Sequence, residues 1–428
     1  MTAEEIHAAI YSMGKTARNA AHALAQLSPE KKSEILKAMG QSLRSSAPEI
    51  LEANKLDLAA GEEKGLSNAM LDRLRLDTAR IDAIAGGIEQ VAELPDPVGE
   101  ELEHTSRPNG ISISKVRVPI GVIGIIFESR PNVTSDAAVL CLKSGNATIL
   151  RGGSEAIHSN KAIAKALQSG GEPAGLPEGA IQLIPFTDRE SVKTLAGMDK
   201  YLDLIIPRGG KGLIETVVSL ARMPVIKHYD GICHAYVDKD ADLDLAISII
   251  DDGKTQKPSV CNALETILVH QDIASSFLPQ LAKRLDTRKV ELRGDAATCQ
   301  ILPTATPATE DDWTTEYLDL IVSVKVVGDL DEAIKHINEH SSQHSEVIIT
   351  NDTQAAQRFQ SEIDSACVFH NVSTRFADGE EFGFGAEIGI STDKLHARGP
   401  MGLKELCSYQ YRISGNGQLK DASRQSAL

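Results

Sequence analysis

Residues 121–127 read Gly-Val-Ile-Gly-Ile-Ile-Phe, an uninterrupted apolar run. Such a run is typical of a parallel strand that is buried on both faces of a sheet. After it, the chain alternates regularly between strand-like runs and helical segments. The expected strands are 121–127, 147–150, 181–185, 202–206 and 225–227, with helices at about 133–143, 155–168, 189–196 and 211–221. This alternation predicts an open, doubly wound α/β domain.

A second alternating series follows the first. Its expected strands are 234–237, 265–270, 318–327, 347–350 and 367–370. We therefore predict a second α/β lobe. Upstream, residues 3–60 carry apolar side chains at helical spacing, and Ser28-Pro29 supplies an N-cap followed by proline. At least two helices are expected to open the chain.

Within residues 101–118, two segments flank the tetrapeptide Arg-Pro-Asn-Gly at 107–110. Asn-Gly favours a tight turn, and the second arm alternates apolar with polar residues, so this segment predicts a protruding β-hairpin. Near the C-terminus, residues 408–413 read Ser-Tyr-Gln-Tyr-Arg-Ile. Their aromatic and β-branched content predicts a late strand, which often pairs outside its own domain.

Bulk composition limits the class of protein. The 428 residues are 42% hydrophobic, enough for two or three domains with cores. Because 60 acidic residues outnumber 44 basic ones, neither a nucleic-acid nor a membrane partner is expected. The six cysteines are scattered without a CxxC pair, so no metal site or disulfide framework is predicted. The first residues lack the basic region and cleavage site of an export signal, and we expect a cytoplasmic protein.

Cys261 stands in the stretch Lys-Pro-Ser-Val-Cys-Asn-Ala, a breaker-rich loop between a predicted helix and a predicted strand. Nearby Lys254 and Lys257, or backbone N–H groups, can lower the pKa of a thiol from about 8.5 and favour the nucleophilic thiolate. The alternative is a buried, inert cysteine, which is common in protein cores.

Two glycine-rich turns each follow a predicted strand and open a helix. They read Arg-Gly-Gly-Ser at 151–154 and Pro-Arg-Gly-Gly-Lys-Gly at 207–212. Backbone N–H groups in such turns can bind phosphate at a helix N-terminus. Neither turn fits GxGxxG, so a simple tight turn is an equal alternative.

The end of the first wound strand, where ligands of such folds gather, carries several polar side chains. Asn132 can donate its amide to an oxyanion or merely cap the next helix, and Glu128, Arg130 and Asp136 are equally ambiguous. His228 can carry a proton or serve as a hydrogen-bonded structural residue. The sequence contains no HExxH, GxSxG or P-loop motif, so zinc, serine-hydrolase and P-loop chemistries are not supported.

Taken in order, these elements resemble the aldehyde dehydrogenase superfamily and, within it, the family of γ-glutamyl phosphate reductases. The likeness covers nearly the whole chain. The stretches that carry it are Val-Pro-Ile-Gly-Val-Ile-Gly (118–124), Phe-Glu-Ser-Arg-Pro-Asn-Val-Thr (127–134), Ile-Pro-Arg-Gly-Gly (206–210), Ser-Val-Cys-Asn-Ala-Leu-Glu-Thr (259–266) and Phe-Gly-Phe-Gly-Ala-Glu-Ile-Gly-Ile-Ser-Thr (382–392).

The resemblance implies an aldehyde dehydrogenase-like α/β fold: a doubly wound Rossmann-type cofactor domain, an α/β catalytic domain and a small β oligomerisation hairpin. The cofactor domain would comprise residues 1–100 and 119–228, with part of 371–404. The hairpin and C-terminal strand would occupy 101–118 and 405–428, and the catalytic domain 229–370. Because the hairpin and strand pair with another subunit in the family, a homodimer or larger homo-oligomer is expected.

The resemblance also implies roles for individual residues. Cys261 would be the thiolate nucleophile, and Asn132 with the Cys261 N–H would form the oxyanion hole. The cofactor-binding residues would be Arg151, Gly152, Ser154, Arg208, Gly209, Gly210 and Glu316. The substrate-binding residues would be Arg130, Ser373, Arg375 and Arg398.

Two positions sharpen the implied activity. In many NAD-using relatives, a lysine stands at the position of Arg151 and a glutamate at that of Ser154. Here the Arg151 guanidinium has no glutamate at 154 beside it, which suits the 2′-phosphate of NADPH. NADPH is therefore expected. His228 stands where oxidising, hydrolytic relatives carry the glutamate that activates water. These features predict NADPH-dependent reduction of L-glutamyl 5-phosphate to L-glutamate 5-semialdehyde and phosphate through a cysteine thioester, in proline biosynthesis. A separate glutamate 5-kinase would supply the substrate.

Two alternatives stay open at this point. One is another phosphorylating or CoA-acylating aldehyde dehydrogenase with the same thioester chemistry. The other is a catalytically silent nucleotide-binding or scaffold protein that kept the fold.

Overall fold

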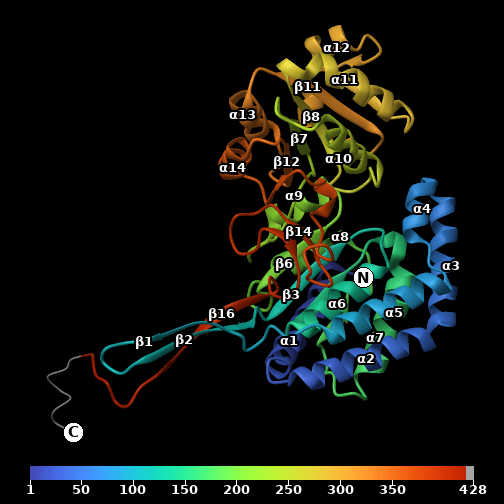
Figure 1. Cartoon of the computed structure of the whole chain (residues 1–428). Coiled ribbons are helices and arrows are strands. Elements are labelled where there is room, and N and C mark those ends of the chain that lie inside the picture. The colour runs from blue at the N-terminus through green and yellow to red at the C-terminus, as the bar shows by residue number, and fades with distance from the viewer. Residues whose placement is uncertain (421–428) are drawn as a thin grey trace. The chain divides into compact units, whose positions relative to one another are not determined.

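The chain folds into two compact units, which Figure 1 shows in a computed structural model that describes residues 1–420, apart from the side chain of Ala69. Unit 1 comprises residues 1–226, 384–388 and 401–420, and unit 2 comprises 227–383 and 389–400. The boundary between the units at 226/227 lies two residues before the predicted domain boundary at 228/229. The hairpin belongs to unit 1. The last eight residues of the predicted segment 405–428 lie outside the described part of the chain.

Five helices open unit 1, three of them within the stretch where at least two were predicted. Capping fixes where they begin: the Thr2 and Glu5 side chains form a capping box, and the Ser28 side chain accepts from the N–H of Lys31. The helices are α1 (Ala3–Leu24), α2 (Pro29–Ser45), α3 (Ala47–Glu63), α4 (Asn68–Leu74) and α5 (Thr78–Glu93).

The wound sheet of unit 1 has four parallel strands in the order β5-β4-β3-β6, which confirms the predicted α/β alternation. The strands are β3 (Val122–Phe127), β4 (Ala147–Arg151), β5 (Ile181–Leu183) and β6 (Leu204–Arg208). The intervening helices are α6 (Asn132–Lys143), α7 (Ile157–Gly171) after the short 3₁₀ turn η1 (Ser154–Ala156), α8 (Arg189–Ala196) and α9 (Lys211–Leu220). All six residues of β3 are buried, as the apolar run predicted. The strand expected at 225–227 is wrong: only Val225 forms a bridge, to Ile205, because the next pair would need an N–H from Pro207, which has none.

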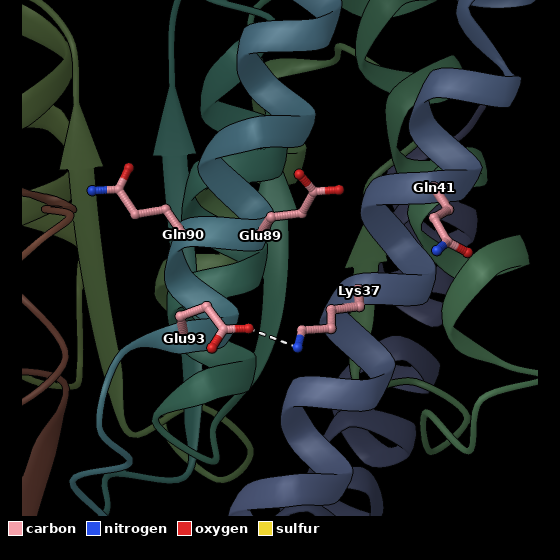
Figure 2. Close-up of a pocket in the computed structure, with 5 residues that line it drawn as sticks. All are labelled: Lys37, Gln41, Glu89, Gln90 and Glu93. Carbon is pink, nitrogen blue, oxygen red and sulfur yellow. Dashed lines mark ion pairs between the residues drawn. The ribbon is translucent and has the colours of Figure 1, made fainter.

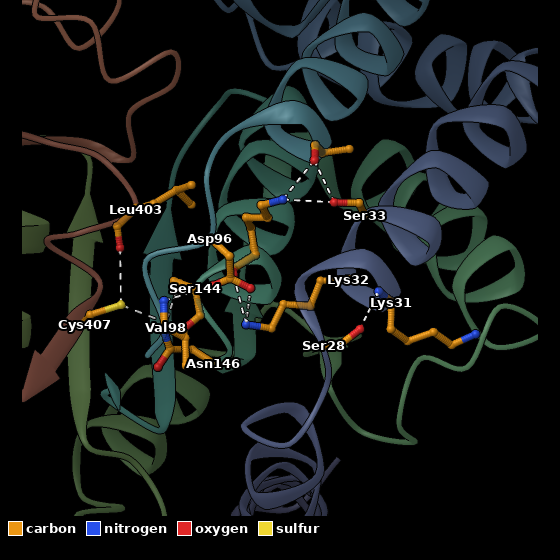
Figure 3. A network of polar contacts seen from close by, with 12 residues as sticks. Ser28, Lys31, Lys32, Ser33, Asp96, Val98, Ser144, Asn146, Leu403 and Cys407 are labelled. Atoms are coloured by element: carbon orange, nitrogen blue, oxygen red, sulfur yellow. Dashed lines mark hydrogen bonds and ion pairs between the residues drawn. The ribbon is translucent and has the colours of Figure 1, made fainter. Parts of the chain in front are cut away.

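A buried polar network ties the opening helices of unit 1 to the sheet (Figure 3). Lys32 Nζ lies 2.9 Å from Asp96 Oδ2, and both side chains are almost fully buried. Lys143 Nζ donates only to neutral oxygens, at 3.0 Å to Ser33 Oγ and 2.8 Å to Ala92 O. Burial lowers the pKa of Lys143, and neighbouring Lys32 lowers it further. This network therefore buries two amines against one carboxylate.

The predicted hairpin is confirmed, and its arms are β1 (Glu101–Ser106) and β2 (Ser112–Pro119). The late strand β16 (Cys407–Ser414) pairs antiparallel with β2, giving the sheet order β1-β2-β16. This sheet projects from the remainder of unit 1 (Figure 1). The β16 side chains Tyr409, Tyr411 and Ile413 are more than half exposed. Exposed apolar side chains on such a sheet are typical of a surface that another chain covers.

Unit 2 is built on seven parallel strands in the order β10-β9-β11-β8-β7-β12-β13. They are β7 (Cys233–Val237), β8 (Leu264–His270), β9 (Glu291–Gly294), β10 (Thr306–Pro307), β11 (Ile321–Val327), β12 (Ser345–Ile349) and β13 (Cys367–His370). The helices are α10 (Leu243–Thr255), α11 (Gln271–Asp286), α12 (Ala296–Ile301), α13 (Leu330–His340) and α14 (Thr353–Glu362). Ala235 and Val237 belong to one core while Tyr236 belongs to another, because successive strand residues point to opposite faces.

Short elements complete the chain: η2 (Glu310–Thr314), η3 (Thr374–Phe376) and the paired strands β14 (Gly389–Ser391) and β15 (Gly399–Met401). Among the helices of residues 1–420, none is long and apolar enough to cross a membrane.

Candidate active site

Cys261 lies in a turn between the end of α10 and the start of β8, and its side chain is half-buried. The Ala263 N–H donates to the Val260 carbonyl at 3.1 Å and closes the turn. Because Cys233 at the start of β7 pairs with Leu264, the turn sits at the amino edge of the parallel sheet. All six cysteines fall within the described residues, and none of them forms a disulfide.

Two consecutive carbonyls of this turn are held by side chains from other elements. The Cys233 thiol donates to Cys261 O at 3.2 Å, and the Thr374 hydroxyl donates to Asn262 O at 2.8 Å. The Asn262 side-chain amide in turn donates to Ala377 O at 2.9 Å. The peptide units on the C-terminal side of Cys261 are therefore fixed in orientation.

Gly231 packs directly against the Cys261 backbone. A Cβ at Gly231 would lie 1.9 Å from Cys261 O, closer than any non-bonded contact, so only glycine fits. The Gly231 N–H donates to Glu316 Oε1 at 2.9 Å. Burial raises the pKa of the Glu316 carboxyl, and this hydrogen bond opposes the shift. The structure thus connects Glu316, a predicted cofactor-binding residue, to the Cys261 turn through Gly231.

We expect Gly231→Ala to lower kcat by roughly 10²-fold, because the added methyl must push the Cys261 peptide by about an ångström. Steady-state kinetics and the rate at which iodoacetamide alkylates Cys261 would measure the change. Gly86→Ala is the matched control, since no atom lies within 4 Å of its Cβ position in α5. Wild-type kinetics in Gly231→Ala would show that the turn tolerates displacement.

Lys254 does not serve Cys261 in the way the sequence suggested. Its amine lies 2.6 Å from Glu265 Oε2, and both side chains are fully buried. Burial raises the pKa of Glu265 to about 7 and lowers that of Lys254, while the pair opposes both shifts. Because Glu265 already neutralises this cation, the expectation that Lys254 activates the thiol is corrected; Lys257 is exposed.

The structure brings two predicted substrate residues to the Cys261 turn. Ser373 is buried and caps η3 by accepting from the Arg375 N–H at 3.3 Å. The Arg375 guanidinium donates to Gln256 Oε1 at 3.0 Å, beside the end of α10. Arg398 instead donates at 2.9 Å to both Oδ1 and the carbonyl O of Asp364, so an internal carboxylate already partners this cation.

His228 is oriented by a backbone acceptor. Its Nδ1–H donates to Ile390 O at 3.0 Å, which makes Nε2 the accepting nitrogen of the neutral ring. The ring of His344 packs edge-on at 6.0 Å between centroids. Burial lowers the pKa of His344 to about 3, so this neighbour is neutral at physiological pH.

Asn132 is the first residue of α6 in unit 1. It does not cap the helix, since the N-cap is Pro131, and the capping alternative is wrong. Its amide donates to Asp136 Oδ2 at 2.7 Å, one turn further along. Arg130 lies exposed just before α6, after Ser129 with its positive φ of 41°. An oxyanion role for Asn132 stays a prediction.

The second glycine turn presents anion-binding donors. Gly210 caps the N-terminus of α9, and its N–H donates to Glu128 Oε2 at 2.9 Å. A Cβ at Gly209 would lie 2.4 Å from the same oxygen, and the Glu128 N–H donates to Arg208 O. The chain's own carboxylate therefore occupies a position suited to a phosphate oxygen. Binding of a nucleotide phosphate at this turn stays a prediction.

The first glycine turn is more crowded. Arg151 donates to Thr187 O at 2.8 Å and to Ser191 Oγ at 3.3 Å, while Gly152 packs on Asn160 and Ser154 begins η1. The nearby Glu155 carboxylate accepts from the Ser129 hydroxyl at 2.8 Å. Burial lowers the pKa of Arg151, and the charge of Glu155 opposes that shift. The prediction of a 2′-phosphate partner assumed that no carboxylate lies near Arg151. The structure places Glu155 near it, so that assumption does not hold.

Sequence reasoning missed Gly231, Cys233 and Thr374, although these residues hold the Cys261 turn. A usable signal was present for one of them. Gly231 directly follows the His-Tyr-Asp stretch at 228–230 before an apolar strand, and glycine in such a place marks a close backbone approach. The thiol of Cys233 and the hydroxyl of Thr374 carried no comparable signal.

A pocket of about 470 Å³ opens between α2 and α5, where Figure 2 shows Lys37 paired with Glu93. Its lining residues are Lys37, Gln41, Glu89, Gln90 and Glu93. None of the predicted site residues is among them, so this pocket is not part of the candidate active site.

Comparison with known proteins gives concordant results. The sequence matches the aldehyde dehydrogenase family over residues 1–318. The γ-glutamyl phosphate reductase of Moorella thermoacetica is 54% identical over 411 residues, which cover 96% of this chain and 98% of that protein. The crystal structure of γ-glutamyl phosphate reductase from Thermotoga maritima superposes with a TM-score of 0.95 at 46% identity, covering 96% of this chain and 99% of that one.

An acetylating aldehyde dehydrogenase from Geobacillus thermoglucosidasius, at 17% identity and a TM-score of 0.68 over 98% of this chain and 99% of that one, shares the fold alone. The predicted aldehyde dehydrogenase-like architecture is confirmed. The chain belongs to the aldehyde dehydrogenase family and, within it, to the γ-glutamyl phosphate reductases, a family of oxidoreductases.

Proposed function

We propose that this enzyme reduces L-glutamyl 5-phosphate to L-glutamate 5-semialdehyde and phosphate, with NADPH as the reductant, in proline biosynthesis. The observation that carries the proposal is the Cys261 turn, which presents one half-buried thiol on a backbone fixed through consecutive carbonyls. A fixed nucleophile is what acyl transfer through a thioester requires. The names of the relatives support the acyl phosphate as substrate.

In the proposed reaction the Cys261 thiolate attacks the acyl carbon, forming an S–C bond as the C–O bond to phosphate breaks. The Asn132 amide and the Cys261 N–H would stabilise the oxyanion that develops on the acyl oxygen. When bound, NADPH supplies the hydride that converts the thioester to a thiohemiacetal. Release of the thiolate then yields the aldehyde, which cyclises towards the proline precursor. In its imidazolium form, with a proton on both ring nitrogens, His228 would be a candidate proton donor to the thiohemiacetal oxygen through Nε2.

The side chain at 228 also supports phosphate, rather than water, as the exchanging group. A glutamate there would deprotonate water for attack on the thioester. The imidazole of His228 is instead tethered by Nδ1 to Ile390 O. We propose that the absence of a glutamate at this position protects the acyl group on Cys261 from hydrolysis.

The binding assignments that we propose are those implied by the family resemblance. The proposed cofactor residues are the two glycine turns with Arg151, Ser154 and Arg208, together with Glu316. The proposed substrate residues are Arg130, Ser373, Arg375 and Arg398. Ser373 and Arg375 are the best supported of these, since their segment bonds to Asn262 beside the nucleophile. We further propose a cytoplasmic homo-oligomer formed through the three-stranded sheet and coupled to glutamate 5-kinase.

The decisive assay runs the reaction in reverse, with glutamate 5-semialdehyde and NADP⁺. We expect turnover to require inorganic phosphate, and NADP⁺ to be preferred over NAD⁺. The control replaces phosphate by sulfate at equal ionic strength. Equal rates with and without phosphate would refute the acyl-phosphate proposal, and stimulation by coenzyme A alone would favour a CoA-acylating enzyme instead.

A further inference from the structure

The buried thiol of Cys233 lies directly behind the candidate nucleophile. It is the first residue of β7, and its Sγ lies 3.2 Å from the carbonyl oxygen of Cys261. Cys233 is fully buried, whereas Cys261 is half-buried. Both cysteines therefore contribute to the same peptide unit, Cys261–Asn262. Cys261 supplies its carbonyl, and the Cys233 thiol donates a hydrogen bond to that carbonyl.

The chemistry of its surroundings keeps Cys233 a donor. Burial raises the pKa of Cys233 well above its ordinary value, and the nearby charge of Glu346 raises it further. A hydrogen bond from the Ser345 backbone opposes these shifts, and His344 Nδ1 lies 3.8 Å from the sulfur. Because His344 is neutral, no cation in this contact promotes ionisation of the thiol. The Cys233 proton is therefore available to the nearer acceptor, Cys261 O.

The Cys261–Asn262 peptide has contacts on several sides. The Cys233 thiol donates to its oxygen, Gly231 packs against that oxygen, and the next carbonyl accepts from Thr374. The direction of this peptide sets the ψ angle of Cys261, and with it the direction of the Cys261 side chain and N–H. A weak hydrogen bond can thus set where the nucleophile and one oxyanion donor point.

We propose that Cys233 is a positioning residue for catalysis, which acts by holding the Cys261 carbonyl rather than by touching the substrate. The inference rests on the proposed function of Cys261. It assigns a role to a second cysteine that takes no part in bond making. It also explains why a thiol, a weak donor, lies buried against a backbone carbonyl in a turn that needs a fixed orientation.

The test compares Cys233→Ala, Cys233→Ser and a matched control, Cys141→Ala, which removes another fully buried thiol, from α6. We expect Cys233→Ala to lower kcat by about 3- to 10-fold, the effect of one hydrogen bond, with little change in KM. Iodoacetamide should alkylate Cys261 more slowly by a similar factor. Cys233→Ser, which keeps a hydroxyl donor, should restore part of both rates.

Thermal unfolding separates positioning from a general loss of packing. Both alanine variants remove a buried thiol, so similar shifts in Tm are expected, and only Cys233→Ala should change kcat and alkylation. Unchanged kcat and alkylation in Cys233→Ala would overturn the proposal. If the wild-type enzyme shows no phosphate-dependent turnover, the proposed function fails, while the alkylation rates still decide whether Cys233 positions Cys261.

Discussion

Cys261→Ser is expected to abolish turnover, with a loss in kcat on the order of 10³-fold or more. A serine hydroxyl does not ionise near neutral pH and is a far weaker nucleophile than a thiolate. The substitution changes one atom in a half-buried turn whose anchors, the Cys233 thiol and the Thr374 hydroxyl, act on backbone carbonyls. We therefore expect the free energy of unfolding and the cofactor Kd to stay close to wild type.

Two measurements complete this test. Mass spectrometry after incubation with glutamate 5-semialdehyde and NADP⁺, without phosphate, should find the acyl adduct on Cys261 of the wild-type enzyme and none in the variant. Cys299→Ser is the matched control, because Cys299 is the other half-buried cysteine of unit 2 and donates to Gly294 O at 3.3 Å. Turnover that survives in Cys261→Ser would remove the thioester from the mechanism.

Lys32→Met is expected to destabilise unit 1 by about 3–5 kcal/mol, because it leaves the buried Asp96 carboxylate without its counter-ion. Lys32 and Asp96 are 1% and 4% exposed, so water cannot replace the lost amine. The companion variant Lys143→Met should cost about 1 kcal/mol or less, since its amine bonds only to Ser33 and Ala92 oxygens. Removing Lys143 relieves its repulsion of Lys32 and also removes its attraction to Asp96.

The choice of probe matters for this comparison. The single tryptophan, Trp313, lies in unit 2, so its fluorescence would not report unfolding of unit 1. Amide hydrogen exchange in α2, α5 and α6 measures the affected region directly. The double variant Lys32→Met/Asp96→Leu should recover much of the loss. Equal destabilisation by Lys32→Met and Lys143→Met would mean that the Lys32–Asp96 ion pair stabilises unit 1 no more than the hydrogen bonds of Lys143 do.

The sequence predicted the sheets best where strands are buried on both faces. The β3 run is apolar throughout and was assigned within one residue, and so was the fully buried strand β8. β9 was missed because Glu291-Leu292-Arg293-Gly294 is polar and partly exposed, with no pattern of period two. Its pairing with β11, 30 residues further along, is what makes it a strand.

Within the site, the sequence singled out Cys261 as the candidate nucleophile but did not reveal what holds it. Cys261 lies in a loop whose sequence could be recognised, within a stretch that resembles the family. Cys233 reaches it only because β7 pairs in register with β8, and Thr374 only because the chain comes back to the Cys261 turn before η3. The Lys254 expectation failed for a related reason: proximity in sequence did not reveal that Glu265, at the start of β8, already neutralises this cation. Partners that tertiary structure brings together cannot be read from local composition.

The position of the nucleophile at the amino edge of its sheet has a practical consequence. Gly231, Cys261, Glu316 and His344 precede β7, β8, β11 and β12, so the candidate nucleophile and these three residues lie at one edge of the unit 2 sheet. The opposite edge carries the loops that follow these strands, including the acidic helix caps Asp329 and Asp352. Those loops are open to redesign, and a fluorophore or affinity tag inserted there would report on the enzyme without entering its reaction path.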